Sequence, residues 1–236
     1  MKVYAVVTMQ LPFNTANMHT SELNIVELFQ QISSSYEMDL VGPIVQTSAK
    51  EWQFVVHNIG HCYDIIRSIL TPLQLHGIDC FTGIGIGTIS TKEASDSRTM
   101  DGEAFIHARN SLNTVLDSYY KNTKVIASKD CKIYVTGNKK AMNSITLICD
   151  DSNVLDLDCL INGLIQNNEY IYYKMTKKQL ESIALYQESK TYQGMMNHDT
   201  SLSKGKISNR LQASNYWLMS QNTKKIKELF CLYQDN

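Results

Sequence analysis

The stretch GIGIGTISTKEASDSRTMDGEAFIHARNSLN, residues 83–113, joins a glycine-rich strand to a polar loop and a helix start. Gly83, Gly85 and Gly87 alternate with isoleucines, so all three glycines lie on one face of the predicted strand. Glycine weakens a strand, and its presence indicates that another backbone or a ligand comes close. The glycine face therefore predicts either a closely packed helix, the commoner reason, or a ligand.

The helix start is the second part of this pattern. Asp101 and Gly102 open the predicted helix over Ala104–Tyr120. The free N–H groups and the dipole of a helix start attract phosphate groups. Together with the glycine strand, this helix gives a candidate ligand-binding set, with a nucleotide as the possible ligand. Its members are Gly83, Gly85, Gly87, Asp101, Gly102 and Arg109.

Outward from this segment, the first 150 residues alternate between strand and helix patterns. Strands are expected at Lys2–Thr8, Asp39–Gln46, Trp52–His57, Asp79–Ile89, Val125–Ala127, Lys132–Val135 and Ile145–Cys149, and helices at Ser21–Ser33, Tyr63–Leu73 and Ala104–Tyr120. This order predicts an α/β (α+β) fold with helices on one face of a mostly antiparallel sheet. Its β-α-β-β-α-β core is the ferredoxin-like pattern.

The sequence after Cys149 predicts only helices. They are expected at Val154–Leu164, Thr176–Glu188, Tyr192–Asn197, Lys204–Ala213 and Tyr216–Leu232. We therefore expect two domains, residues 1–150 and residues 151–236. The last helix is rich in aromatic side chains, so it either docks on the first domain or pairs two chains.

Composition and charge narrow the function classes. The chain has 236 residues, 43% apolar residues and a formal net charge of −1, which excludes a uniformly basic nucleic-acid coat protein. The charge is unevenly divided, because residues 1–169 carry −6 and residues 170–236 carry +5. No apolar run approaches a membrane span, the N-terminus lacks a signal-peptide pattern, and the six cysteines form no closely spaced pair. These features predict a cytoplasmic protein with reduced thiols and no membrane association.

The segment at residues 83–113 resembles the SatD family of bacterial proteins. The resemblance rests on the GIGIG strand and the DGEAFIHARNSL helix, in which Ala108-Arg109-Asn110 stands where the family has an Asn-Ala-Arg type of stretch. It extends to the C-terminal part and to the overall length. The same strand, loop and helix layout is similar to class III nucleotidyl cyclase domains, so the resemblance implies a cyclase-like N-terminal domain.

The cyclase resemblance implies two metal-binding aspartates, one at the end of the first strand and one in the next hairpin. Here the first strand ends Val7-Thr8-Met9-Gln10, and the hairpin reads Ala49-Lys50-Glu51-Trp52-Gln53. Both aspartates are missing, and Lys50 brings positive charge to the place of a cation. We therefore expect no cyclase activity, no bound metal and no cofactor, with sensing, dimerisation or partner docking as the domain's role.

A helix-turn-helix pattern lies at about residues 176–214. A short helix with inward Met195 and Met196 precedes a turn and a helix whose inner face carries Ile207 and Leu211. Polar and basic side chains on the outer face can neutralise phosphates and reach base edges in the major groove. The segment LSKGKISNRLQASN resembles the recognition helix of bacterial regulators, and SatD-like proteins carry a similar element. The candidate DNA-binding residues are Ser203, Lys204, Lys206, Ser208, Asn209, Arg210 and Gln212.

The leading hypothesis is a DNA-binding transcriptional regulator that acts as a homodimer. A solvated amphipathic helix in a small bundle would give the same pattern as the recognition helix. Two other function classes also stay open. One is a nucleotide-binding or nucleotidyl-cyclase-type enzyme, and the other is a protein-interaction factor of a phage or mobile element.

Overall fold

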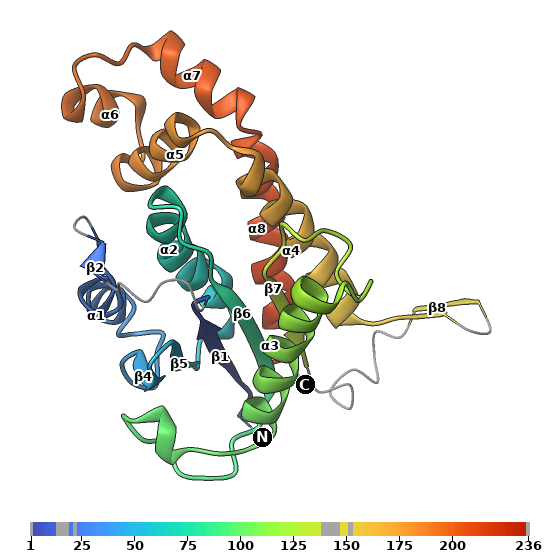
Figure 1. The fold of residues 1–236 in the computed structure, drawn as a ribbon. Coiled ribbons are helices and arrows are strands. Elements are labelled where there is room, and N and C mark those ends of the chain that lie inside the picture. Colours follow the sequence, from blue (N-terminus) through green and yellow to red (C-terminus); the bar gives the residue numbers. More distant parts are fainter. Residues whose placement is uncertain (1, 13–18, 21–22, 138–146, 151–152, 235–236) are drawn as a thin grey trace.

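A computed structural model describes residues 2–12, 19–20, 23–137, 147–150 and 153–234 of the chain. Within them, a mixed α/β N-terminal region with a five-stranded sheet is followed by an all-helical C-terminal region (Figure 1). The structure thus confirms this coarse division, which the sequence predicts.

The central sheet has the strand order β4-β5-β1-β6-β7. Its strands are β1 (Tyr4–Gln10), β4 (Val45–Ser48), β5 (Glu51–Val56), β6 (Phe81–Gly87) and β7 (Ile133–Thr136). β1 pairs antiparallel with β5 and β6, β4 pairs antiparallel with β5, and β6 pairs parallel with β7. The sheet is therefore mostly antiparallel, as expected. The parallel pair needs a crossover, which helix α3 (Glu103–Lys121) provides.

Helices cover both faces of this sheet. On one face, Ala5 and Val7 of β1 share a core with α1 (Ile25–Ser35) and α2 (Cys62–Leu75). On the other face, Tyr4 and Val6 pack with residues of α3. The expectation of helices on a single face is therefore wrong. The physical reason is the glycine strand β6, whose flat face forms a second packing surface.

Strand β7 lies at one end of the sheet order, and helix α4 (Leu157–Lys174) packs against it. The buried Asn162 of α4 accepts a hydrogen bond from the Val135 N–H and donates one to the Val135 carbonyl, both at 2.8 Å. This side-chain amide takes the place of a neighbouring strand's peptide group, and helices covering sheet edges prevent wrong strand pairing. The first helix after residue 150 therefore packs on the N-terminal sheet.

The remaining helices are α5 (Lys177–Ser189), α6 (Tyr192–His198), α7 (Lys204–Ala213) and α8 (Tyr216–Cys231). Four of the five helices expected after residue 150 are confirmed within a residue or two at each end. They share a second core formed by Tyr172, Leu180, Ile183, Met195, Leu202, Ile207, Leu211 and Met219. Figure 1 shows α5, α6 and α7 gathered at one end, with α8 leading back to the sheet. Ile226 and Phe230 of α8 are buried in the sheet core, so of the two roles that the sequence left open for this helix, it takes the docking one.

Several element boundaries differ from the prediction. Val154 does not begin a helix but lies in β9 (Asn153–Leu155), which pairs with β8 (Leu147–Asp150), and α4 begins only after its N-cap Asp156. Val125–Ala127 is irregular, although it was expected to be a strand. The expected strand start Ile145 lies outside the described residues.

The bounds of β4, α1 and α2 also differ from those predicted. The strand expected at Asp39–Gln46 is β4, which begins at Val45 after a single bridge from Leu40 to Val56. Helix α1 begins at Ile25 with Asn24 as its N-cap, after the short strands β2 (His19–Thr20) and β3 (Leu23–Asn24), while Ser21 lies outside the described residues. Helix α2 continues through Pro72 to Leu75, and at its end the His76 N–H bonds the Pro72 and Leu73 carbonyls.

The described residues include no helix that is long and apolar enough to cross a membrane. Five cysteines are described as free thiols, of which Cys62, Cys80 and Cys131 are buried. Burial raises the pKa of the Cys80 and Cys131 thiols to about 12, so both stay protonated near neutral pH.

Candidate functional site

The glycine face of β6 lies directly beneath α3. A Cβ atom added to Gly83 would lie 2.3 Å from the Ala108 carbonyl oxygen, and one added to Gly85 would lie 2.1 Å from the Ala104 carbonyl oxygen. At Gly87 the nearest atoms, from Ala104 and Glu103, would be 3.1 Å away. Helix α3 therefore fills the space in which a ligand on Gly83 and Gly85 would lie, and helix packing explains these two glycines.

The start of α3 is occupied by the chain itself. Gly102 has a φ of +149°, and an added Cβ would lie 2.7 Å from the Thr88 carbonyl oxygen, so the position favours glycine. The exposed Asp101 accepts a hydrogen bond from the Gly102 N–H at 2.7 Å, and the Ala104 N–H donates to the Thr88 carbonyl at 3.2 Å. The strand-to-helix loop thus supplies acceptors at this helix start.

Arg109 lies two turns along α3 and faces another partner. Its Nη1 and Nη2 donate to the two carboxylate oxygens of Glu51 at 2.7 and 2.6 Å. Thr47 adds a hydrogen bond to the same carboxylate at 3.0 Å. The Arg109 guanidinium lowers the pKa of Glu51 below its ordinary value, against the burial that would raise it. Arg109 therefore joins α3 to the β4–β5 hairpin, away from Asp101 in the candidate ligand set.

The two places where the cyclase pattern has aspartates are neighbours in the structure. Thr8 of β1 lies opposite Gln53 of β5, and Gln10 lies opposite Glu51. The Gln53 amide donates to the Thr8 hydroxyl at 3.3 Å. Of these four paired residues, only Glu51 is a carboxylate, and two guanidinium N–H groups already bind it. No group of three or more His, Cys, Asp or Glu side chains that could hold a metal occurs in the part of the chain that the structure describes.

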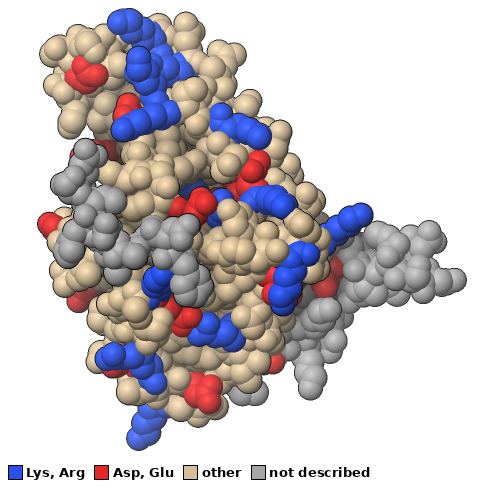
Figure 2. Space-filling model, in the orientation of Figure 1, with Lys and Arg blue, Asp and Glu red and all other residues tan. Residues whose placement is uncertain are grey.

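Helices α5, α6 and α7 form a three-helix unit around the predicted turn. Ile207 and Leu211 of α7 are fully buried against α5 and α6, which confirms the inner face predicted for this helix. The Ser203 hydroxyl accepts a hydrogen bond from the Lys206 N–H at 3.3 Å, so Ser203 is the N-cap of α7. Figure 2 shows Lys and Arg side chains gathered at this end of the molecule.

The candidate DNA-binding residues divide into two groups by exposure. The exposed ones are Lys204, Lys206, Asn209 and Gln212, together with the cap Ser203. Ser208 and Arg210 are half-buried, and the Arg210 guanidinium donates to the Ser182 hydroxyl of α5 at 3.3 Å. Arg210 therefore fixes α7 to α5. Lys204 is exposed at the first turn of α7, and Lys206, Asn209 and Gln212 are exposed along the helix.

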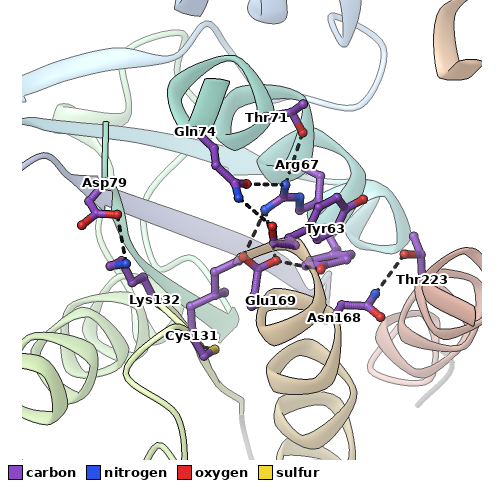
Figure 3. Close-up of polar contacts among 12 residues, drawn as sticks. Tyr63, Arg67, Thr71, Gln74, Asp79, Cys131, Lys132, Asn168, Glu169 and Thr223 are labelled. Carbon is purple, nitrogen blue, oxygen red and sulfur yellow. Dashed lines mark hydrogen bonds and ion pairs between the residues drawn. The ribbon is translucent and has the colours of Figure 1, made fainter. Parts of the chain in front are cut away.

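A buried polar cluster between α2 and α4 was not predicted from the sequence (Figure 3). Arg67 donates from Nη1 to both carboxylate oxygens of Glu169, at 3.1 and 3.3 Å, and the Tyr63 hydroxyl donates to Glu169 at 2.9 Å. The Arg67 guanidinium also lies 3.5 Å from the centre of the Tyr172 ring. Burial raises the pKa of the Tyr63 and Tyr172 hydroxyls, so both stay protonated near neutral pH.

A sequence signal for this cluster exists at Arg67. It interrupts the apolar stripe of α2 that Ile66, Ile69 and Leu70 continue, so a charged side chain stands on a buried face. Buried charges are almost always paired. The partner Glu169 lies 102 positions away, and no spacing rule connects the two.

Comparison with known proteins gives one match. The model of the SatD family matches residues 13–150. No protein of curated function and no solved structure matches the chain.

Proposed function

This chain belongs to the SatD family, and we propose that it acts as a DNA-binding transcriptional regulator that contacts DNA through α7. The observation that carries the proposal is that two buried side chains anchor α7 while basic and polar side chains of the same helix stay exposed. Ile207 and Leu211 anchor the helix on α5 and α6, while Lys204, Lys206 and Asn209 stay exposed. Lysines at such positions neutralise phosphates, and asparagine bonds adenine edges.

Gly205 leaves room for such a contact. It lies in the first turn of α7, and among the described residues no heavy atom would come within 4 Å of an added Cβ. Gly163 of α4 is an exposed helical glycine of the same kind, so this feature does not require a DNA contact. In the proposed complex, a DNA backbone approaches the start of α7 at Gly205.

For the N-terminal region we propose the ferredoxin-like, cyclase-like fold. The strand order β4-β5-β1-β6 and its three antiparallel pairs agree with that arrangement, with β7 added in parallel. Thr8 and the Arg109-bound Glu51 stand near the places of the metal aspartates, so the proposal assigns the region no enzymatic activity. Its role is sensing, dimerisation or partner docking, and cyclic nucleotide formation by the purified protein from ATP or GTP with manganese would contradict it.

The test of DNA binding uses the full chain and two matched double variants. Fluorescence anisotropy with a random DNA library measures affinity as a function of salt, and sequence selection then finds the preferred site. Replacing Lys204 and Lys206 with alanine should weaken binding and lower the salt slope by up to about two units. Replacing Lys224 and Lys225, two exposed lysines of α8, changes the charge equally and should leave both values nearly unchanged.

The outcomes separate the function classes. Undetectable DNA affinity of the intact protein at low salt would overturn the proposal, and so would equal losses in the two double variants. Regulators with this helix arrangement commonly bind two half-sites as dimers. The proposal therefore includes a homodimer, and a light-scattering mass of a single chain on DNA-free and DNA-bound protein would contradict that part.

A further inference from the structure

A cavity of about 340 Å³ opens where the sheet region meets the helical region. Its walls come from α2, the segment that joins α2 to β6, the segment before β7, and the C-terminal end of α4. Arg67, Asp79, Lys132 and Glu169 lie in these walls, together with the rings of Tyr172 and Tyr173. We propose that this cavity binds a small zwitterion, with a free α-amino acid as the chemical class.

A donor for the carboxylate of such a ligand is present at Arg67. The side chain is 92% buried, and its other N–H groups bond Glu169, Thr71 and Gln74. The Nε–H has no hydrogen-bond partner among the described residues. A buried donor without a partner is costly, and guanidinium groups bind carboxylates with short, charge-assisted bonds. The Nε atom is itself buried beside the cavity that Arg67 lines, so a ligand carboxylate would satisfy this donor once it displaces the atoms that cover it.

Lys132 adds a second cation to the same wall. Its side chain is 11% exposed, and its ammonium lies 2.9 Å from the Asp79 carboxylate and 5.2 Å from the centre of the Tyr173 ring. The aspartate and the aromatic ring hold this ammonium group in place at the cavity wall. The cavity therefore presents two fixed positive groups to a ligand carboxylate.

Acceptors for the ammonium group of the ligand lie at the rim. The Asp79 side chain is 47% exposed, and Asp130 bonds Lys174 at 3.5 Å. Each carboxylate accepts more hydrogen bonds than one lysine supplies. The half-exposed ring of Tyr173 stands beside them, with the ammonium groups of Lys132 and Lys174 at 5.2 and 5.5 Å from its centre.

Size and charge together select the ligand class. The cavity volume lies at the small end of the range for ligand pockets, which favours a molecule of few atoms. A nucleotide's phosphates would meet the three carboxylates of Asp79, Asp130 and Glu169. A simple organic acid would leave the rim carboxylates unused, and a simple amine would leave the Arg67 donor unused. A zwitterion uses both.

A ligand in this cavity would contact the junction between the sheet region and the helical region. Tyr172 belongs both to the cavity wall and to the core of the helical region, and Met175 of the wall precedes the N-cap of α5. A bound ligand would therefore restrain the junction from which α5–α7 extend. An effect on DNA affinity rests on the proposed function, whereas the binding of the ligand does not.

The test is isothermal titration calorimetry of the full chain against each common free amino acid, with ATP, GTP and inorganic phosphate as comparison probes. At least one amino acid should bind saturably with a Kd at or below about 1 mM. Its N-acetyl and amide derivatives should lose most of that affinity, because each lacks one of the two charges. The comparison probes should leave that binding unaffected.

Two variants place the binding in the cavity. Asp79→Asn should weaken it at least about tenfold. The matched control Asp117→Asn changes an aspartate of equal exposure, 46%, that also pairs with a lysine, and it should have no effect. Arg67→Lys keeps the charge opposite Glu169 but removes Nε–H, and it should also weaken binding. Thermal unfolding checks that the fold survives, and Asp79→Asn decides alone if Arg67→Lys does not fold.

Four results would overturn the proposal. They are the absence of amino-acid binding up to about 10 mM, equal binding of the N-acetyl derivative, equal losses in Asp79→Asn and Asp117→Asn, and competition by phosphate or a nucleotide. The effect of these variants on DNA affinity without an amino acid, and the effect of a bound amino acid on DNA affinity, test only the proposed function.

Discussion

Arg67 of α2 and Glu169 of α4 form a buried ion pair, with Nη1 3.1 Å from Oε2 and each side chain only 8% exposed. The pair links two helices that are 102 residues apart, one from the sheet region and one from the helical region. Tyr63 and Tyr172 enclose it from two sides, and both tyrosines are nearly fully buried. The junction between the two regions is therefore held by charge as well as by apolar packing.

Removal of one partner should be strongly destabilising. Glu169→Ala leaves the Arg67 guanidinium buried without its counter-charge, and the expected loss in the free energy of unfolding is about 3–5 kcal/mol. Asp117→Ala removes an exposed pair with Lys121 on α3 and should cost less than about 0.5 kcal/mol. Urea unfolding measures both, and a loss from Glu169→Ala as small as that of the control would contradict the role of the pair.

The glycines of the chain should respond to alanine in opposite ways. Gly85→Ala places a methyl group against backbone atoms of α3, at 2.1 Å from the Ala104 oxygen, and neither strand nor helix can turn aside. The expected loss of stability is about 3 kcal/mol, the upper end of ordinary overpacking costs. In Gly163→Ala the new methyl group on the exposed side of α4 meets no heavy atom of the described chain within 4 Å, so stability should rise by about 0.5–1 kcal/mol.

Thermal or urea unfolding of the two variants decides the point. If Gly85→Ala were as stable as the native chain, the glycine strand would have room above it. The hypothesis that a ligand binds against Gly83 and Gly85 would then regain support.

Local patterns were enough to predict most of the fold. The apolar stripes of α2 and α3 and the alternation around β6 gave the element order, because these periods depend only on neighbouring residues. These local patterns could not show whether helices cover one face of the sheet or both. The sequence showed that something packs on Gly83 and Gly85, but not that this would be α3 on the face opposite α1 and α2.

Contacts between distant segments were not predictable. Asn162 bonds the backbone of Val135, and Arg67 bonds Glu169, yet an asparagine or a glutamate within a helix is ordinarily exposed. The exposure of Asn209 was predictable, because a helix with Ile207 and Leu211 inward must turn Asn209 outward. Lys204 shares the i, i+3, i+7 stripe of Ile207 and Leu211 and is exposed because it is the first residue of α7. The hydrogen bond between Arg210 and Ser182 was not predictable, since it depends on the packing of α5.

The pair between Glu51 and Arg109 should make stability depend on pH. Arg109 lowers the pKa of Glu51 in the folded protein below the ordinary value of 4.5. The pair therefore adds stability above the unfolded-state pKa and loses it as pH falls through the lower folded-state value. Because Arg109 is 48% exposed, Arg109→Gln should cost no more than about 1 kcal/mol at pH 7 and less near pH 3.

Urea unfolding of the native chain and the variant at the two pH values measures this difference. Arg98→Gln is the control, since Arg98 pairs with Asp96 in a local exposed contact and should not alter stability measurably at either pH. A loss in Arg109→Gln that is equal at pH 7 and pH 3 would show that Glu51 does not contribute through its charge.

Gly205 separates stability from DNA binding. Gly205→Ala should stabilise the protein by about 0.5 kcal/mol, because alanine is the better helix residue and no described atom lies within 4 Å of the new methyl group. If α7 contacts DNA at its first turn, the same methyl group stands between the helix and the phosphate backbone. DNA affinity should then fall at least about fivefold while stability rises, a combination that general damage to the fold cannot produce.

Gly163→Ala is the matched control, because it adds a methyl group to another exposed helical glycine far along the chain from α7. It should raise stability without changing DNA affinity. Anisotropy titrations at one fixed salt concentration and urea unfolding give the two quantities for both variants. If Gly205→Ala binds DNA as tightly as the native chain, the first turn of α7 does not approach the DNA, and the contact must be assigned to later residues of the helix or to another element.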